Sequence, residues 1–143
     1  MKPQSCKAKG RRLQQTIVGD LLEMYPQLSD DDIRSTSMGA GGEDVQMSSA
    51  ARRLIPFSFE AKNQERVNVW DAMDQCRANA PSNVDPVVVM KKNQQKPHVL
   101  VSWDCFKRLI ARPSASAPPT SRALLLEMAT ELQRIAATME NSE

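Results

Sequence analysis

The stretch FSFEAK, residues 57–62, decides the fold and the site that this sequence predicts. Aromatic residues alternate in it with small or charged residues, and successive side chains of a strand point to opposite faces of the sheet. The two phenylalanines therefore share one face with Ala61, and Glu60 shares the other with Lys62. The pattern predicts a strand that packs an apolar face on the core and carries a carboxylate beside an ammonium. The same pattern also fits a solvated strand face with a weak ion pair.

A second alternating stretch, residues 44–48, begins with Asp44 directly after a glycine-rich segment. The glycines either form a phosphate nest or make a tight turn that delivers Asp44, and the turn is favoured because the G-x-x-x-x-G-K-[ST] pattern is missing. If the two strands are antiparallel neighbours, Asp44 and Glu60 converge. With the Ala61 carbonyl they would form an oxygen site suited to Mg²⁺, and Lys62 would hold a metal-bound water.

Periodicity places further elements around this pair of strands. A mixed α/β fold is expected, with a central mixed sheet of about five strands flanked by helices. Two tryptophans, Trp70 and Trp103, occupy apolar helical positions and are expected in the core, whereas His98 is expected at the surface. The expected helices are residues 10–25, 66–79, 104–111 and 121–139, and the expected strands are residues 33–38, 44–48, 57–62, 87–90 and 98–102.

Composition indicates one globular domain with an appendage. The chain has 143 residues, of which 41% are hydrophobic and 25% charged, and it shows no apolar run of the ~20 residues that cross a bilayer. Three scattered cysteines and one histidine argue against a disulfide framework and a zinc site, so a cytoplasmic location is expected. The expected organisation is a domain over residues 1–112, a Pro/Ser/Ala linker over 113–120 and an amphipathic helix within 121–143.

The net charge of the chain is only +2, but basic residues are concentrated at its beginning. Residues 1–12 hold only basic charged groups, and such an arm gathers phosphates by releasing their counterions. A basic terminus that only keeps the protein in solution is the alternative. Few aromatic residues are present, 4% of the chain, which favours recognition of a nucleic-acid backbone over base stacking.

The motifs and the order of elements resemble the PD-(D/E)xK nuclease superfamily. The matching residues are Gly41-Gly42-Glu43-Asp44 and Glu60-Ala61-Lys62, followed by a helix that carries Gln75. Within the superfamily, the chain is most similar to the Holliday-junction-resolvase-like branch, which includes small phage-encoded members. There the first helix begins with a basic segment and a glycine, here Lys9-Gly10-Arg11-Arg12. The resemblance covers roughly residues 7–110.

The resemblance implies a restriction-endonuclease-like core and a Mg²⁺- or Mn²⁺-dependent DNA endonuclease that acts on branched or structured DNA. Asp44, Glu60 and the Ala61 backbone would ligate the metal, while Lys62 positions the attacking water near Gln14 and Gln75. No nucleotide cofactor or membrane is implied, and the location is the cytoplasm, that of the host if a phage encodes the chain. The DNA backbone would be held by Lys7, Lys9, Arg11, Arg12, Arg52, Arg53, Lys91, Lys92 and Lys96.

Two departures from the family keep an alternative open. Gln14 stands where relatives often place a glutamate, which implies one metal or weaker binding, and Glu43 replaces the proline of the family name. The alternative is a catalytically weak or silent DNA-binding module. The resemblance also implies a homodimer, and apolar residues with heptad spacing in the last helix fit either a second chain or docking on the same domain. A small assembly protein that acts through this helix is a third reading. The heptad residues are Leu125, Met128, Leu132, Ile135 and Met139.

Overall fold

The computed structural model describes residues 3–37, 40–111 and 128–134, and the side chains from residue 7 onward within these ranges. The chain divides into two compact units, Met1–Lys107 and Arg108–Glu143. The expected linker, residues 113–120, lies outside the described residues. Of the expected C-terminal helix, only residues 128–134 are described, and they are helical. No helix in the described part of the chain is long and apolar enough to span a membrane.

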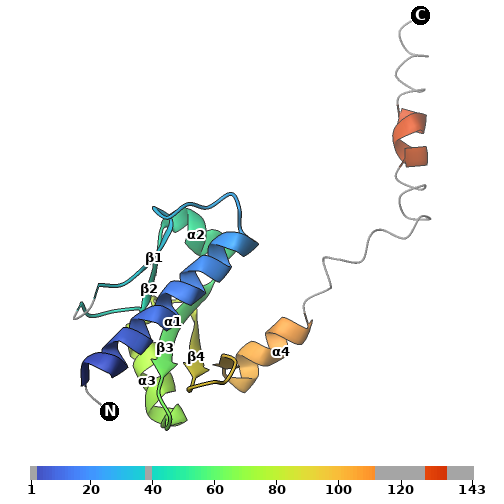
Figure 1. Cartoon of the computed structure of the whole chain (residues 1–143). Helices are drawn as coiled ribbons and strands as arrows, with labels where there is room; N and C mark the ends of the chain where they lie inside the picture. The colour runs from blue at the N-terminus through green and yellow to red at the C-terminus, as the bar shows by residue number, and fades with distance from the viewer. Residues whose placement is uncertain (1–2, 38–39, 112–127, 135–143) are drawn as a thin grey trace, which may run out of the picture. The chain divides into compact units, whose positions relative to one another are not determined.

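Helix α1 (Pro3–Met24) starts earlier than the sequence predicts and ends just before Pro26. Leu13, Ile17 and Leu21 recur at helical spacing and are buried, so they form the face that covers the sheets. Figure 1 shows α1 running across the strands of the first unit. This position brings the basic first turns of the helix toward the segment between β1 and β2, which ends at Asp44.

The strands form two small sheets. β1 (Ile33–Ser35) and β2 (Val45–Met47) make an antiparallel pair. β3 (Phe57–Asn63) lies parallel to β4 (Asp85–Lys91), and β4 is antiparallel to β5 (His98–Leu100). The mixed α/β class is therefore confirmed, with five strands in sheets of two and three where the sequence predicts one central sheet.

The two sheets meet at Asp44, where the segment before β2 contacts β3. The hydrogen bonds at this contact differ from those of a continuous β ladder. The Asp44 N–H donates to the Phe59 carbonyl at 3.2 Å, as in a β ladder. The next donor on β3, the Ala61 N–H, is taken by the Asp44 side chain at 2.7 Å. Because the carboxylate replaces the carbonyl that a continued strand would supply, β2 and β3 share no further ladder hydrogen bond of this kind.

Three helices complete the domain. Helix α2 (Ser49–Leu54) is not predicted by the sequence, and Ser48 caps it by accepting the Ala51 N–H. Helix α3 (Val69–Asn79) is capped by Asn68, and α4 (Trp103–Ala111) follows β5. A six-residue helix is too short to show a periodic pattern, which is why this segment reads as a simple connection.

The alternation along β3 and β4 divides the core into two clusters. Phe57, Phe59 and Ala61 face α1 with Val87 and Val89. The opposite face packs against α3, where Val88 joins Ala72, Met73 and Cys76 in a second buried cluster. Since Glu60 pairs in register with Val88, its side chain lies on the α3 face.

The prediction that the two tryptophans lie in the core is wrong. Trp70 is 78% exposed and Trp103 is 67% exposed. Trp70 follows the first residue of α3, where the helix presents its buried face through Ala72, Met73 and Cys76 instead. Trp103 opens α4 and stacks at a tilt on Phe106, with ring centroids 5.8 Å apart, while Cys105 supplies the buried contact. His98 is exposed, as predicted.

Replacing Arg52 with Ala is expected to destabilise the domain. The Arg52 guanidinium donates to both carboxylate oxygens of Glu43, at 2.8 and 3.1 Å, and to the Phe57 carbonyl at 2.6 Å. The substitution leaves two part-buried acceptors without this donor, so the free energy of unfolding should fall by about 1–3 kcal/mol. Urea unfolding measures the change. Arg53→Ala is the matched control on the same helix, because Arg53 is exposed, and equal effects of both changes would contradict the assignment.

Candidate active site

Asp44 is held in place by its neighbours on two strands. Gly42 has φ +102°, a conformation that L side chains rarely adopt, and the chain turns there before reaching Asp44. The Thr36 N–H donates to the Asp44 carbonyl at 2.9 Å, and the Thr36 hydroxyl donates to the carbonyl of Glu43. Together with the two contacts to β3, these bonds fix the carboxylate against the edge of β3 at Ala61.

Glu60 and Lys62 lie side by side on the α3 face of β3. The Lys62 ammonium is 2.8 Å from a Glu60 carboxylate oxygen, and it donates to the side-chain carbonyl of Gln75 on α3, also at 2.8 Å. The Glu60 side chain is only 4% exposed and that of Lys62 is 18% exposed. The structure thus places Glu60 beside Lys62, as the alternation predicts, and brings to them Gln75, the residue that the resemblance singles out.

The environment of Glu60 opposes its ionisation. Burial is the largest cause and raises the pKa of Glu60 above its ordinary value, although the hydrogen bond and charge of Lys62 act in the other direction. The charge of Asp44 raises this pKa further, and a hydrogen bond with Asn79 lowers it. The two carboxylates are therefore close enough to repel each other. A divalent cation between them would remove this repulsion.

The Ala61 carbonyl faces the same edge of β3 as the Asp44 carboxylate. The N–H and C=O groups of one extended residue point to the same side of a strand, and the Ala61 N–H points at Asp44. Two carboxylates and one carbonyl form a set of hard oxygen ligands. Mg²⁺ typically takes one or two carboxylates and keeps several waters, so this set fits the ion that the sequence predicts.

The set of possible metal ligands at this site is small. Within the described ranges, no group of three or more His, Cys, Asp or Glu side chains is arranged to hold a metal. Glu43, the acid next to Asp44, does not enlarge the set because its carboxylate is bound to Arg52. A cation at this position would therefore complete its coordination with water or with phosphate oxygens.

A basic pocket adjoins Asp44. Its volume is about 160 Å³, and one wall comes from the first turns of α1 while the other comes from the segment between β1 and β2. Gln14 lies in the wall formed by α1. The residue that stands where relatives often have a glutamate is therefore close to Asp44. The lining residues are Lys7, Gly10, Arg11, Gln14, Thr36, Ser37, Ala40 and Asp44.

The other predicted DNA contacts occupy different surroundings. Lys9 donates to the Asn93 side chain at 2.8 Å, and Asn63 donates to the Lys9 carbonyl at 3.1 Å, which ties α1 to β3 and to the turn after β4. Arg12, Lys91 and Lys92 line a cavity of about 240 Å³ beside this tie. Arg52 is used inside the domain, as described above. Arg53 and Lys96 are exposed.

Sequence reasoning missed Thr36 and Asn79. The Thr36 hydroxyl donates to the carbonyl of Glu43, in the turn before Asp44. Asn79, in the last turn of α3, lowers the pKa of Glu60 through a side-chain hydrogen bond. One signal was available for Asn79, because it lies four residues after Gln75 and helical residues at that spacing share a face. For Thr36 no pattern in the sequence singled it out.

Comparisons of this chain with protein-family models, with curated proteins and with solved structures gave no match.

Proposed function

We propose that this protein is a Mg²⁺- or Mn²⁺-dependent DNA endonuclease that hydrolyses phosphodiester bonds in branched or structured DNA. The observation that carries the proposal is the cluster at the β2–β3 junction. Asp44 contacts the Ala61 backbone, Glu60 is buried beside it, and Lys62 bridges Glu60 and Gln75. A buried carboxylate with a raised pKa in such a cluster is more typical of a functional site than of a stabilising surface pair.

Each residue has a role in this proposal. A bound divalent cation would lower the pKa of a coordinated water and offset charge on the scissile phosphate. Asp44, Glu60 and the Ala61 carbonyl hold the cation. The Lys62 ammonium, kept in position by Gln75, orients the attacking water and stabilises the negative charge that develops on the phosphate. Gln14 lies across the pocket from Asp44 and orients water by hydrogen bonding without adding charge.

A cleavage assay on a panel of DNAs tests the proposal. The panel contains a four-way junction, a flap, nicked duplex, single strands and plain duplex, each with and without Mn²⁺. We expect Mn²⁺-dependent cutting, fastest on a branched substrate, and its loss in Lys62→Ala. Gln75→Ala should retain partial activity because Lys62 keeps its contact with Glu60. Undiminished cutting by Lys62→Ala would refute the site.

The pocket beside Asp44 is proposed to receive a DNA phosphate. Lys7 and Arg11 line it from α1, and among the residues that the structure describes Asp44 supplies the acidic group of the lining. Removing one phosphate contact should lower the slope of log affinity against log salt by about 0.9. We expect this change in Arg11→Gln, measured by fluorescence anisotropy at several salt concentrations. Arg77→Gln is the control, because Arg77 is exposed on α3 and already pairs with Asp74 at 3.4 Å. Equal slopes for Arg11→Gln and the unaltered protein would contradict the proposal that this pocket receives a phosphate.

A DNA-binding module without catalysis is the second candidate. It is favoured by the small donor set, two carboxylates and a carbonyl, and by glutamine at position 14. Calorimetry separates the two candidates, since a module binds DNA but takes up neither Mg²⁺ nor Mn²⁺.

A homodimer through the C-terminal helix is also proposed. In the helical residues 128–134, Met128 is 55% exposed and Leu132 is 64% exposed, four residues apart on one face. Light scattering coupled to gel filtration should show a dimer that Leu132→Glu converts to a monomer. A dimer that persists in this variant would exclude the helix as its interface.

A further inference from the structure

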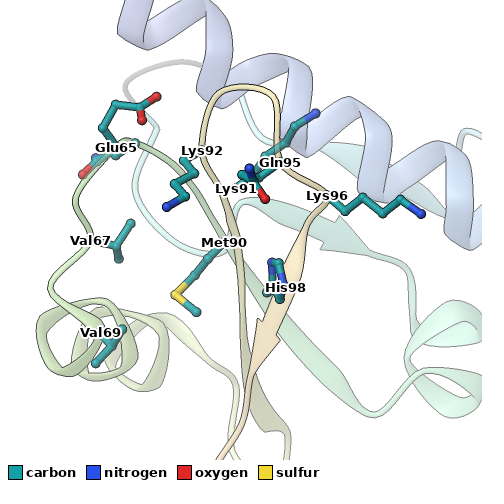
Figure 2. Close-up of a pocket in the computed structure, with 10 residues that line it drawn as sticks. Glu65, Val67, Val69, Met90, Lys91, Lys92, Gln95, Lys96 and His98 are labelled. Atoms are coloured by element: carbon teal, nitrogen blue, oxygen red, sulfur yellow. The ribbon is translucent and has the colours of Figure 1, made fainter.

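A third cavity lies on the same face of the sheet as Lys62, between α3 and the turn that joins β4 to β5. Its volume is about 270 Å³. Val67, Val69 and Met90 supply an apolar floor, and Lys92 and His98 stand at its rim. Figure 2 shows the side chains of Met90 and Lys92 turned toward the space that Val69 borders from α3.

The cavity is bounded by the core below and by hydrogen-bonded loops at its rim. Val67 and Met90 pack against the buried cluster under α3, so the floor continues the core. The rim is held by hydrogen bonds: the Gln64 N–H donates to the Lys91 carbonyl at 3.0 Å, and the Asn93 N–H donates to the Glu65 carboxylate, also at 3.0 Å. A cavity with fixed walls keeps its shape before any ligand arrives, which lowers the cost of binding.

Register places this cavity next to the proposed active site. Lys62 pairs with Met90 across β3 and β4, and Met90 pairs with His98 across β4 and β5. The three side chains form one row on the α3 face. Two strand spacings separate Lys62 from His98, roughly 10 Å. A DNA strand cut at Lys62 would therefore pass the cavity within about three nucleotides of the cut.

The rim carries free positive charge. Within the described residues, neither Lys92 nor Lys96 forms an ion pair or a side-chain hydrogen bond. The one carboxylate of the lining, Glu65, already accepts the Asn93 N–H. An apolar floor beside the unpaired Lys92 ammonium matches a ligand that has an apolar part and an attached anion.

We propose that this cavity binds one unpaired nucleotide of the DNA strand, with the base on the apolar floor and its phosphate at Lys92. The proposal rests on the proposed function, since it supplies the preference of that enzyme for structured DNA. The volume is below the ~300–1,000 Å³ of pockets for drug-sized ligands and suits one ring system. His98 adds an imidazole face, and histidine is among the side chains on which unstacked bases lie.

Binding without divalent metal tests this inference apart from catalysis. The probes are a fully paired duplex and the same duplex with one unpaired 2-aminopurine. We expect about tenfold tighter binding of the second probe, with a change in its fluorescence. Val69→Ser and His98→Ala should each bring the two affinities to within about twofold, because base contacts are lost while phosphate contacts remain.

Lys107→Gln is the control for this experiment. Lys107 is an exposed residue of α4 that pairs with Asp104 and does not line the cavity, so the preference should persist. Serine at the first residue of α3 keeps the helix, and circular dichroism verifies that each variant folds. Equal affinity of the unaltered protein for both probes would overturn the inference, as would an unchanged preference in both cavity variants. If cutting at Lys62 is observed nonetheless, the proposed function stands without this pocket.

Discussion

Replacing Asp44 with Asn is expected to weaken cation binding and to slow DNA cleavage strongly while the domain stays folded. An asparagine side chain has the same shape, and its carbonyl oxygen still accepts the Ala61 N–H that Asp44 binds at 2.7 Å. The fold therefore keeps its β2–β3 contact, but the site loses one of two carboxylates. We expect the Mn²⁺ affinity to fall by about tenfold to a hundredfold and the cleavage rate by about 10²–10³-fold. Calorimetric titration and single-turnover cleavage measure the two effects.

Glu43→Gln is the matched control for this prediction. Glu43 precedes Asp44 and is also an acid, but its carboxylate pairs with Arg52 at 2.8 Å. The substitution weakens that pair, so stability should fall by about 1 kcal/mol while Mn²⁺ affinity stays within about threefold. If Glu43→Gln lost cation binding and Asp44→Asn retained it, the metal-binding carboxylate would belong to Glu43 and not to Asp44.

Replacing Glu60 with Gln is expected to abolish cleavage without lowering stability. Burial raises the pKa of Glu60, so the folded protein holds this proton more tightly than the unfolded chain does. Ionised Glu60 thus opposes folding, and a neutral isostere removes that cost. The Lys62 ammonium loses its ionic partner but keeps the Gln75 carbonyl at 2.8 Å. We expect the free energy of unfolding of Glu60→Gln to equal or exceed that of the unaltered protein near neutral pH.

The pH dependence of this difference follows from the direction of the shift. When the folded-state pKa of an acid is raised, stability is greatest below the unfolded-state pKa and is lost as pH rises through the folded-state value. From the ordinary value of 4.5 upward, the unaltered protein should therefore lose stability relative to Glu60→Gln. Thermal melts from about pH 4 to about pH 8 measure the difference. A variant that is less stable at every pH would show that the Glu60–Lys62 pair serves the fold.

Local patterns in the sequence predicted much of this structure. Alternation in residues 57–62 gave the faces of β3 correctly, since burial of the phenylalanine side follows directly from the period of a strand. The continuous apolar run 87–90 marked β4, which is covered on both faces by α1 and α3. The resemblance to the nuclease superfamily, and not a local pattern, singled out Gln75, whose side-chain carbonyl accepts from Lys62 at 2.8 Å.

The parts that sequence reasoning did not reach depend on tertiary contacts. The boundary between the two sheets coincides with a tertiary contact, in which the Asp44 side chain takes the N–H of Ala61 that a ladder would use while the Asp44 carbonyl accepts from Thr36. The exposure of Trp70 and Trp103 depends on which face of a short helix meets the core, and hydrophobicity alone does not fix that. Helix α2 depends on its Ser48 cap and on Arg52, whose partners lie outside the helix.

The central claim is that one divalent cation binds between Asp44, Glu60 and the Ala61 carbonyl. The most direct measurement is an anomalous difference map from a crystal of the protein grown with Mn²⁺. We expect one peak at the β2–β3 junction, within coordination distance of the Asp44 and Glu60 carboxylates and next to the Lys62 ammonium. Manganese bound only at other acidic residues, or an empty junction in a crystal that holds Mn²⁺ elsewhere, would contradict it.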